Sequence, residues 1–118
     1  MSFADVLRCF ADRRDGFATV VRLTDEWADR YSVPRPVFGP DTPVRQEIWS
    51  AEQVGAHLDR LARIEPRMIT DESPRRLYGP LVLVDFRHGR IGQIDGRRRA
   101  NVWRHQPGQY GVLILCGF

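Results

Sequence analysis

Two uninterrupted apolar runs do most to limit what this chain can fold into. The segments LVLVDF (81–86) and YGVLIL (110–115) have the length of strands and lie next to Gly and Pro residues. Runs of this kind indicate strands that are buried within a sheet. The chain has 118 residues and 42% of them are hydrophobic, so we expect one domain over 1–118 with a small core.

Periodicity and turn residues predict the other elements. Ser50 and Gln53 form a capping-box pattern before an amphipathic helix over 51–64, and Gly89 predicts a tight turn between two hairpin strands. His57 is expected to be a surface or flanking residue of that helix rather than a ligand. The other elements expected along the chain are a helix from Phe3 to Gly16, a strand over 17–23, a short helix capped by Thr24, a proline-rich loop over 33–43, a long loop over 65–80, a strand over 91–95 and a helix over 96–106.

These elements divide the domain into two parts. Residues 1–44 hold the N-terminal helix, strand and proline-rich loop, whereas 45–118 hold the core. In the core a strand leads into a helix and returns as a strand, which predicts a right-handed crossover. The expected fold class is therefore α/β (or α+β) with a small mixed sheet. No apolar stretch approaches the roughly 20 residues that span a bilayer, so we expect a cytoplasmic bacterial or phage-type protein without a membrane partner.

The positive charge of the chain is concentrated in its second half. All 18 basic residues are arginine, and the formal net charge is +3. Residues 1–58 hold 7 arginines against 9 acidic residues, whereas 59–118 hold 11 against 6. An anion-binding face is therefore expected in the second half, although the asymmetry is smaller than in a dedicated DNA-binding domain. The planar guanidinium group suits phosphate and carboxylate partners.

The stretch QIDGRRRANVW (93–103) places a glycine and three arginines where a strand is expected to end and a helix to begin. The first N–H groups of a helix lack partners within it, and the helix dipole is positive there, so an anion is stabilised at this point. We therefore expect Gly96 and Arg97–Arg99 to bind phosphate. The alternative is that the arginines extend into water or pair with Asp85 and Asp95.

The stretch DGRRRA (95–100), in its frame of strands and helices, resembles the ParB/sulfiredoxin-like superfamily. The resemblance covers roughly residues 45–116. It implies a ParB/sulfiredoxin-like core in which Gly96 forms the turn and Arg98 and Arg99 contact nucleotide phosphates. Sulfiredoxins have a cysteine where this chain has Arg97, so sulfiredoxin activity is not expected. No helix-turn-helix domain follows the motif, so the chain is not expected to be a full partition protein.

The same resemblance suggests candidates for catalysis. Some relatives phosphorylate small molecules and others are nucleases, and both need carboxylates. Asp95 and Asp85 are thereby implied as a base or as ligands of Mg²⁺, with a nucleoside triphosphate as a possible cofactor. Cys9 and Cys116 have no metal-ligand spacing, and the histidines form no matched set, so we expect no structural metal.

Further side chains are candidates for holding a nucleotide. Arg75 and Arg76, in the long loop, are expected to assist phosphate binding, because bidentate arginine–phosphate contacts are strong. Tyr78 and Trp103 are candidates for stacking on a base, although Trp103 also fits a core position.

Two functions remain open from the sequence. The leading hypothesis is a phosphate-binding domain for a nucleotide or nucleic-acid backbone, with Mg²⁺-dependent phosphoryl transfer or phosphodiester cleavage as its chemistry if it is an enzyme. The alternative is a non-enzymatic protein–protein interaction module or inhibitor from a mobile element that uses the same fold.

Overall fold

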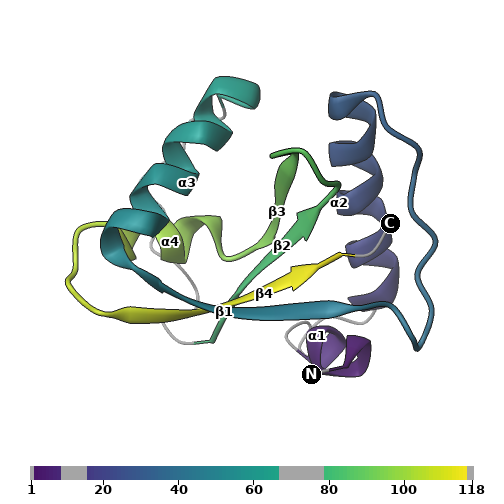
Figure 1. Cartoon of the computed structure of the whole chain (residues 1–118), viewed down its shortest axis with the longest axis horizontal. Helices are drawn as coiled ribbons and strands as arrows, with labels where there is room; N and C mark the ends of the chain where they lie inside the picture. The colour runs from purple at the N-terminus through teal and green to yellow at the C-terminus, as the bar shows by residue number, and fades with distance from the viewer. Residues whose placement is uncertain (1, 9–15, 67–78, 117–118) are drawn as a thin grey trace.

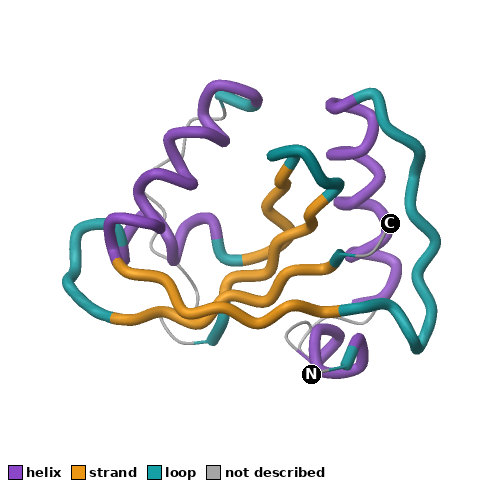
Figure 2. Tube along the Cα trace, viewed as in Figure 1, coloured by secondary structure: helices purple, strands orange, loops and turns teal. Residues whose placement is uncertain are grey.

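The computed structural model describes residues 2–8, 16–66 and 79–116. These residues form a small mixed α/β structure in which four helices surround a four-stranded sheet (Figures 1 and 2). In chain order the elements are α1 (Phe3–Arg8), α2 (Gly16–Tyr31), β1 (Val44–Ser50), α3 (Ala51–Ile64), β2 (Leu81–Asp85), β3 (Ile91–Asp95), α4 (Arg97–Trp103) and β4 (Gln109–Leu115).

The sheet is mixed, with the strand order β1-β4-β2-β3. β1 pairs with β4 antiparallel, β4 with β2 parallel, and β2 with β3 antiparallel. The two apolar runs of the sequence therefore become β2 and β4, the central strands, as expected. The tight turn and the hairpin strand after β2 are also confirmed.

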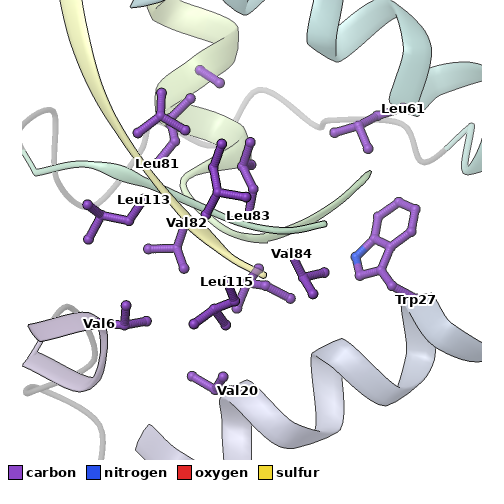
Figure 3. Close-up of a cluster of buried hydrophobic side chains, with 14 of the residues drawn as sticks. Val6, Val20, Trp27, Leu61, Leu81, Val82, Leu83, Val84, Leu113 and Leu115 are labelled. Atoms are coloured by element: carbon purple, nitrogen blue, oxygen red, sulfur yellow. The ribbon is translucent and has the colours of Figure 1, made fainter. Parts of the chain in front are cut away.

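Both faces of the central strands are buried. The register places Leu81 and Leu83 on one face, and Val82 and Val84 on the other. Figure 3 shows Leu61 of α3 on one side of the strands, and Val6 of α1 with Val20 of α2 on the other. Helices on both faces explain why β2 and β4 have no polar alternation.

The strand expected over 17–23 is wrong, because these residues lie inside the 16-residue helix α2. Its buried positions, Val20, Thr24, Trp27 and Ala28, follow a helical stripe that starts among the β-branched residues. Thr24 is buried within this helix rather than capping a new one. The Trp27 ring lies directly against Gly92 of β3, where any side chain larger than hydrogen would collide with it.

The strand β1 was not expected from the sequence. It pairs along its whole length with β4, from Val44 opposite Leu115 to Ser50 opposite Gln109. Ser50 ends the strand and immediately caps α3. Its hydroxyl accepts a hydrogen bond from the Gln53 N–H, and its own N–H donates to the Gln53 side chain, so the capping box is confirmed.

The simple crossover expected in the core is also wrong. β3 and β4 are not neighbours, because β2 lies between them, and α4 links two antiparallel strands. The parallel pair β2 and β4 is joined by a longer connection that contains both β3 and α4. Within the described part of the chain, no helix is long and apolar enough to cross a membrane.

Candidate functional site

Gly96 lies between β3 and α4, as the sequence indicates. It caps the helix with a φ of +92°, a left-handed conformation that favours glycine. A Cβ at this position would lie 2.8 Å from the Arg99 guanidinium and 2.8 Å from the Leu81 side chain. The close approach that this glycine permits is therefore made by two side chains of the protein itself.

Arg97 connects three helices. Its guanidinium donates 3.0 Å hydrogen bonds to the Glu65 carboxylate and to the Glu65 backbone carbonyl, just beyond α3. Arg30 of α2 lies 3.5 Å from the same carboxylate and stacks over the Trp27 ring. Because Arg97 and Glu65 are both largely buried, this group of charges holds the C-terminal ends of α2 and α3 to the start of α4.

Arg99 points into the protein. Its side chain is 6% exposed, donates to the Pro80 carbonyl and lies 3.6 Å from the Asp95 carboxylate. The guanidinium carbon also lies 5.7 Å from the centre of the Trp103 ring. Arg98, by contrast, is exposed. The three consecutive arginines therefore point in different directions, and Arg97 and Arg99 bind acceptors of the protein itself.

Asp85 and Asp95 lie at opposite ends of the β2–β3 hairpin. Asp95 is opposite Val82 and Asp85 is opposite Ile91, so the backbone positions of the two residues are about 10 Å apart along β2. Asp85 accepts a 2.8 Å hydrogen bond from the Arg87 N–H and lies 3.3 Å from Arg45. The two carboxylates therefore do not fit a shared Mg²⁺ ion that would hold a triphosphate. Among the described residues, no group of three His, Cys, Asp or Glu side chains is placed to hold a metal.

Trp103, a candidate for base stacking, lies inside the protein. It is 7% exposed, and its ring stacks on Tyr110 at 4.5 Å between centroids. The other candidates in the long loop, Arg75, Arg76 and Tyr78, lie outside the described residues.

His57 is buried, which corrects the expected surface position. It is 1% exposed, because it lies on the same stripe of α3 as Val54, Leu58 and Leu61. Its Nε2–H donates to the Gln93 side-chain oxygen at 2.6 Å. Burial lowers the pKa of His57 to about 4, so the ring is neutral at pH 7. The helical spacing from Val54 was the sequence signal for this burial.

The turn between β2 and β3 presents a second set of basic side chains. Arg87, His88 and Gly89 have φ values of +74°, +56° and +77°, and the first two are unusual for residues with a side chain. The turn is fixed by backbone hydrogen bonds from Phe86 to the Arg90 carbonyl and from Arg90 to the Arg87 carbonyl. Arg87, His88 and Arg90 are exposed, and so are Arg60 and Arg63 of α3. We call these five residues the hairpin cluster.

The charge of Arg60 acts on the Tyr31 hydroxyl, which is bonded to the first residue of β3. Burial raises the pKa of the Tyr31 hydroxyl, and its hydrogen bond with Ile91 and the charge of Arg60 lower it. The hydroxyl donates to the Ile91 carbonyl at 2.6 Å. Arg60 therefore lies near the start of β3, which follows directly on Arg90. In the view of Figure 1 the β2–β3 turn lies between α2 and α3.

The carboxylates around the hairpin cluster already have arginine partners elsewhere. Asp59 is 2.8 Å from Arg104, Asp85 contacts Arg45, and Glu65 binds Arg97 and Arg30. Among the described residues, the cluster's own side chains make no ion pair. Arg60 and Arg63 are exposed residues of α3 that the sequence did not single out.

Comparison with known proteins identifies neither a family nor a function for this chain. No protein-family model matches the chain, and neither the characterised proteins nor the solved structures give a significant match.

Proposed function

We propose that this chain binds nucleic acid through the phosphate backbone, and that the hairpin cluster makes the contact. The observation that carries the proposal is the surplus of exposed cations at the β2–β3 turn and on α3, beside carboxylates that are already paired. Exposed arginines of this kind bind phosphate strongly, because the guanidinium group forms bidentate, charge-assisted hydrogen bonds. Such contacts give affinity and little sequence preference.

The shape of the turn also supports the proposal. Left-handed conformations at Arg87 and His88 cost about 1 kcal/mol each, and such conformations gather at functional sites. The turn places these two residues at the end of the hairpin, outside the protein core, with its backbone held by two hydrogen bonds. A backbone that is already ordered loses less conformational entropy on binding.

The phosphate contact proposed here uses other residues than the one implied by the ParB-like resemblance, although both lie in the second half of the chain. In the ParB-like hypothesis, Arg99 and its neighbours bind the phosphate. Arg97 and Arg99 instead use their guanidinium groups to hold Glu65, Pro80 and Asp95. The proposed function therefore includes no catalytic step, and it assigns Gly96, Arg97 and Arg99 to the stability of the domain.

Fluorescence anisotropy with labelled oligonucleotides tests the proposal. Single-stranded and duplex DNA and RNA are titrated with the whole chain, and with the double variant Arg87→Ala/Arg90→Ala. The matched control is Arg22→Ala, because Arg22 is an exposed arginine of α2 whose partner is Glu26. We expect binding that falls about tenfold or more in the double variant and is unchanged in the control. Equal binding by all three proteins, or no binding to any oligonucleotide, would contradict the proposal.

A further inference from the structure

The two edges of the sheet differ in whether other parts of the protein cover their outward backbone groups. At the β3 edge, side chains of α2 bind the outward carbonyls: the Trp27 Nε1–H donates to Gln93 at 2.9 Å and the Tyr31 hydroxyl to Ile91. These bonds leave no room for another strand. At the β1 edge, the described residues include no such cover. An uncovered edge is a template for pairing with another strand.

The hydrogen-bond pattern identifies the free groups of β1. The Cys116 N–H donates to the Pro43 carbonyl, so alternate residues from Pro43 onward face β4. The N–H and C=O groups of Val44, Gln46 and Ile48 therefore point away from the sheet. The same alternation turns the Ser50 N–H outward, where Gln53 accepts it. Within the described part of the chain, the outward groups of Val44, Gln46 and Ile48 have no hydrogen-bond partner.

The strand also lacks two of the features that commonly protect an edge, a bulge and a proline. The register with β4 runs without a bulge over the whole of β1. No proline lies within the strand, and the Ile48 side chain is 60% exposed. The edge is thus regular, extended and partly apolar, which are the properties of a strand that pairs with another chain.

We propose that β1 pairs antiparallel with β1 of a second copy of this chain, around a twofold axis that passes between the two Gln46 residues. In this register Val44 lies opposite the partner's Ile48, and Arg45 lies opposite the partner's Glu47. The outward N–H and C=O groups of both strands then satisfy one another. The result is a continuous eight-stranded sheet.

The charges on β1 select this register over its neighbours. Arg45 and Glu47 lie on the same face of the strand and already contact each other at 2.6 Å. Sliding the partner by two residues in one direction places Arg45 opposite the partner's Arg45. Sliding it by two in the other direction places Glu47 opposite the partner's Glu47. Like charges directly opposite each other are unfavourable, so the register centred on Gln46 is the one that is electrostatically matched.

Light scattering after size exclusion tests the dimer, with the whole chain at a series of concentrations. We expect a dimer for the native sequence and a monomer for Gln46→Pro, because proline removes the outward N–H at the centre of the pairing. The same N–H plays no part in the β1–β4 ladder, so the fold should be kept, with its far-UV circular dichroism unchanged. The control Gln46→Thr keeps the N–H and should remain dimeric. A native chain that is monomeric at every concentration, or a folded Gln46→Pro variant that is still a dimer, would overturn the proposal.

Cysteine cross-linking tests the register. In a background with Cys9→Ser and Cys116→Ser, Gln46→Cys should form an intermolecular disulfide, because opposed residues of a hydrogen-bonded pair have Cα atoms about 5.5 Å apart. Ile48→Cys is the control, since its two copies lie more than about 13 Å apart in the proposed register. Cross-linking of Ile48→Cys in place of Gln46→Cys would contradict the register. The hairpin cluster lies beyond the opposite edge, so this inference does not depend on the proposed function.

Discussion

The His57 imidazole lies 2.6 Å from the side-chain oxygen of Gln93, inside the protein and between α3 and β3. The amide group of Gln93 in turn donates to the Asp95 carbonyl, immediately before Gly96. A neutral imidazole therefore holds the irregular end of β3, where the β2–β3 register shifts, and positions the start of α4. Burial of such a polar pair is acceptable only while each donor has its acceptor.

The burial of His57 predicts that acid destabilises the domain. The folded pKa of His57 is about 4 and its ordinary value is 6.5, so the unfolded chain binds more protons between these pH values. Stability is therefore retained above pH 6.5 and lost as the pH falls towards 4. At about 1.4 kcal/mol per pH unit the loss is about 3 kcal/mol. Urea unfolding across this range measures it.

The matched pair for this experiment is His57→Gln and His88→Gln. His88 is exposed on the turn and makes no described contact through its ring. Replacing it should leave the pH dependence of unfolding unchanged, whereas replacing His57 should flatten the dependence between pH 6.5 and 4. Equal slopes in the two variants would show that His57 is not the group responsible.

The arginine triplet predicts unequal effects on stability. Arg97→Ala removes both 3.0 Å hydrogen bonds to the largely buried Glu65, which should cost about 3 kcal/mol. Arg98→Ala, at an exposed position of the same helix, should change stability by no more than about 0.5 kcal/mol. Thermal or urea unfolding of the two variants decides this. Similar, small losses in both would mean that Arg97 is not a structural residue.

Substitutions at Gly96 and Gly79 separate the effect of backbone strain from that of steric crowding. Both have a left-handed φ, +92° and +99°, but a Cβ at Gly96 meets Arg99 and Leu81, whereas a Cβ at Gly79 meets nothing. Gly79→Ala should therefore lose about 1 kcal/mol from backbone strain alone. Gly96→Ala should lose about 3 kcal/mol, because crowding is added to the strain. Equal losses in equilibrium unfolding would show that the contact with Arg99 does not require the glycine.

The part of the fold that local sequence controls was predicted well. The capping box at Ser50, the turn at Gly89 and the apolar runs of β2 and β4 each depend on residues close together in the chain. Part of α2 was predicted to be a strand because its β-branched residues are typical of strands. The helical spacing of its buried residues becomes clear only when the pattern is extended to Trp27. β1 was missed because its exposed polar residues give no signal until β4 pairs with it.

The candidate site depended on long-range contacts, which the sequence does not show. Arg97 meets Glu65, and Arg99 meets Pro80, in pairs separated by 32 and 19 residues. The expected alternative, pairing with an acidic residue, agrees with the Arg99–Asp95 contact, whereas the contacts with Glu65 and Pro80 were not expected. The expectation of a basic second half survives, with α3 and the hairpin as its exposed part.

The salt dependence of nucleic-acid binding tests the central claim most directly. The logarithm of the binding constant falls linearly with the logarithm of salt concentration, with a slope of about 0.9 for each duplex phosphate that the protein neutralises. We predict a clear negative slope for the native chain, and a slope smaller by about two for Arg87→Ala/Arg90→Ala, one for each arginine. The control Arg22→Ala should keep the native slope. The same slope in all three proteins would contradict the claim that the hairpin cluster contacts phosphate.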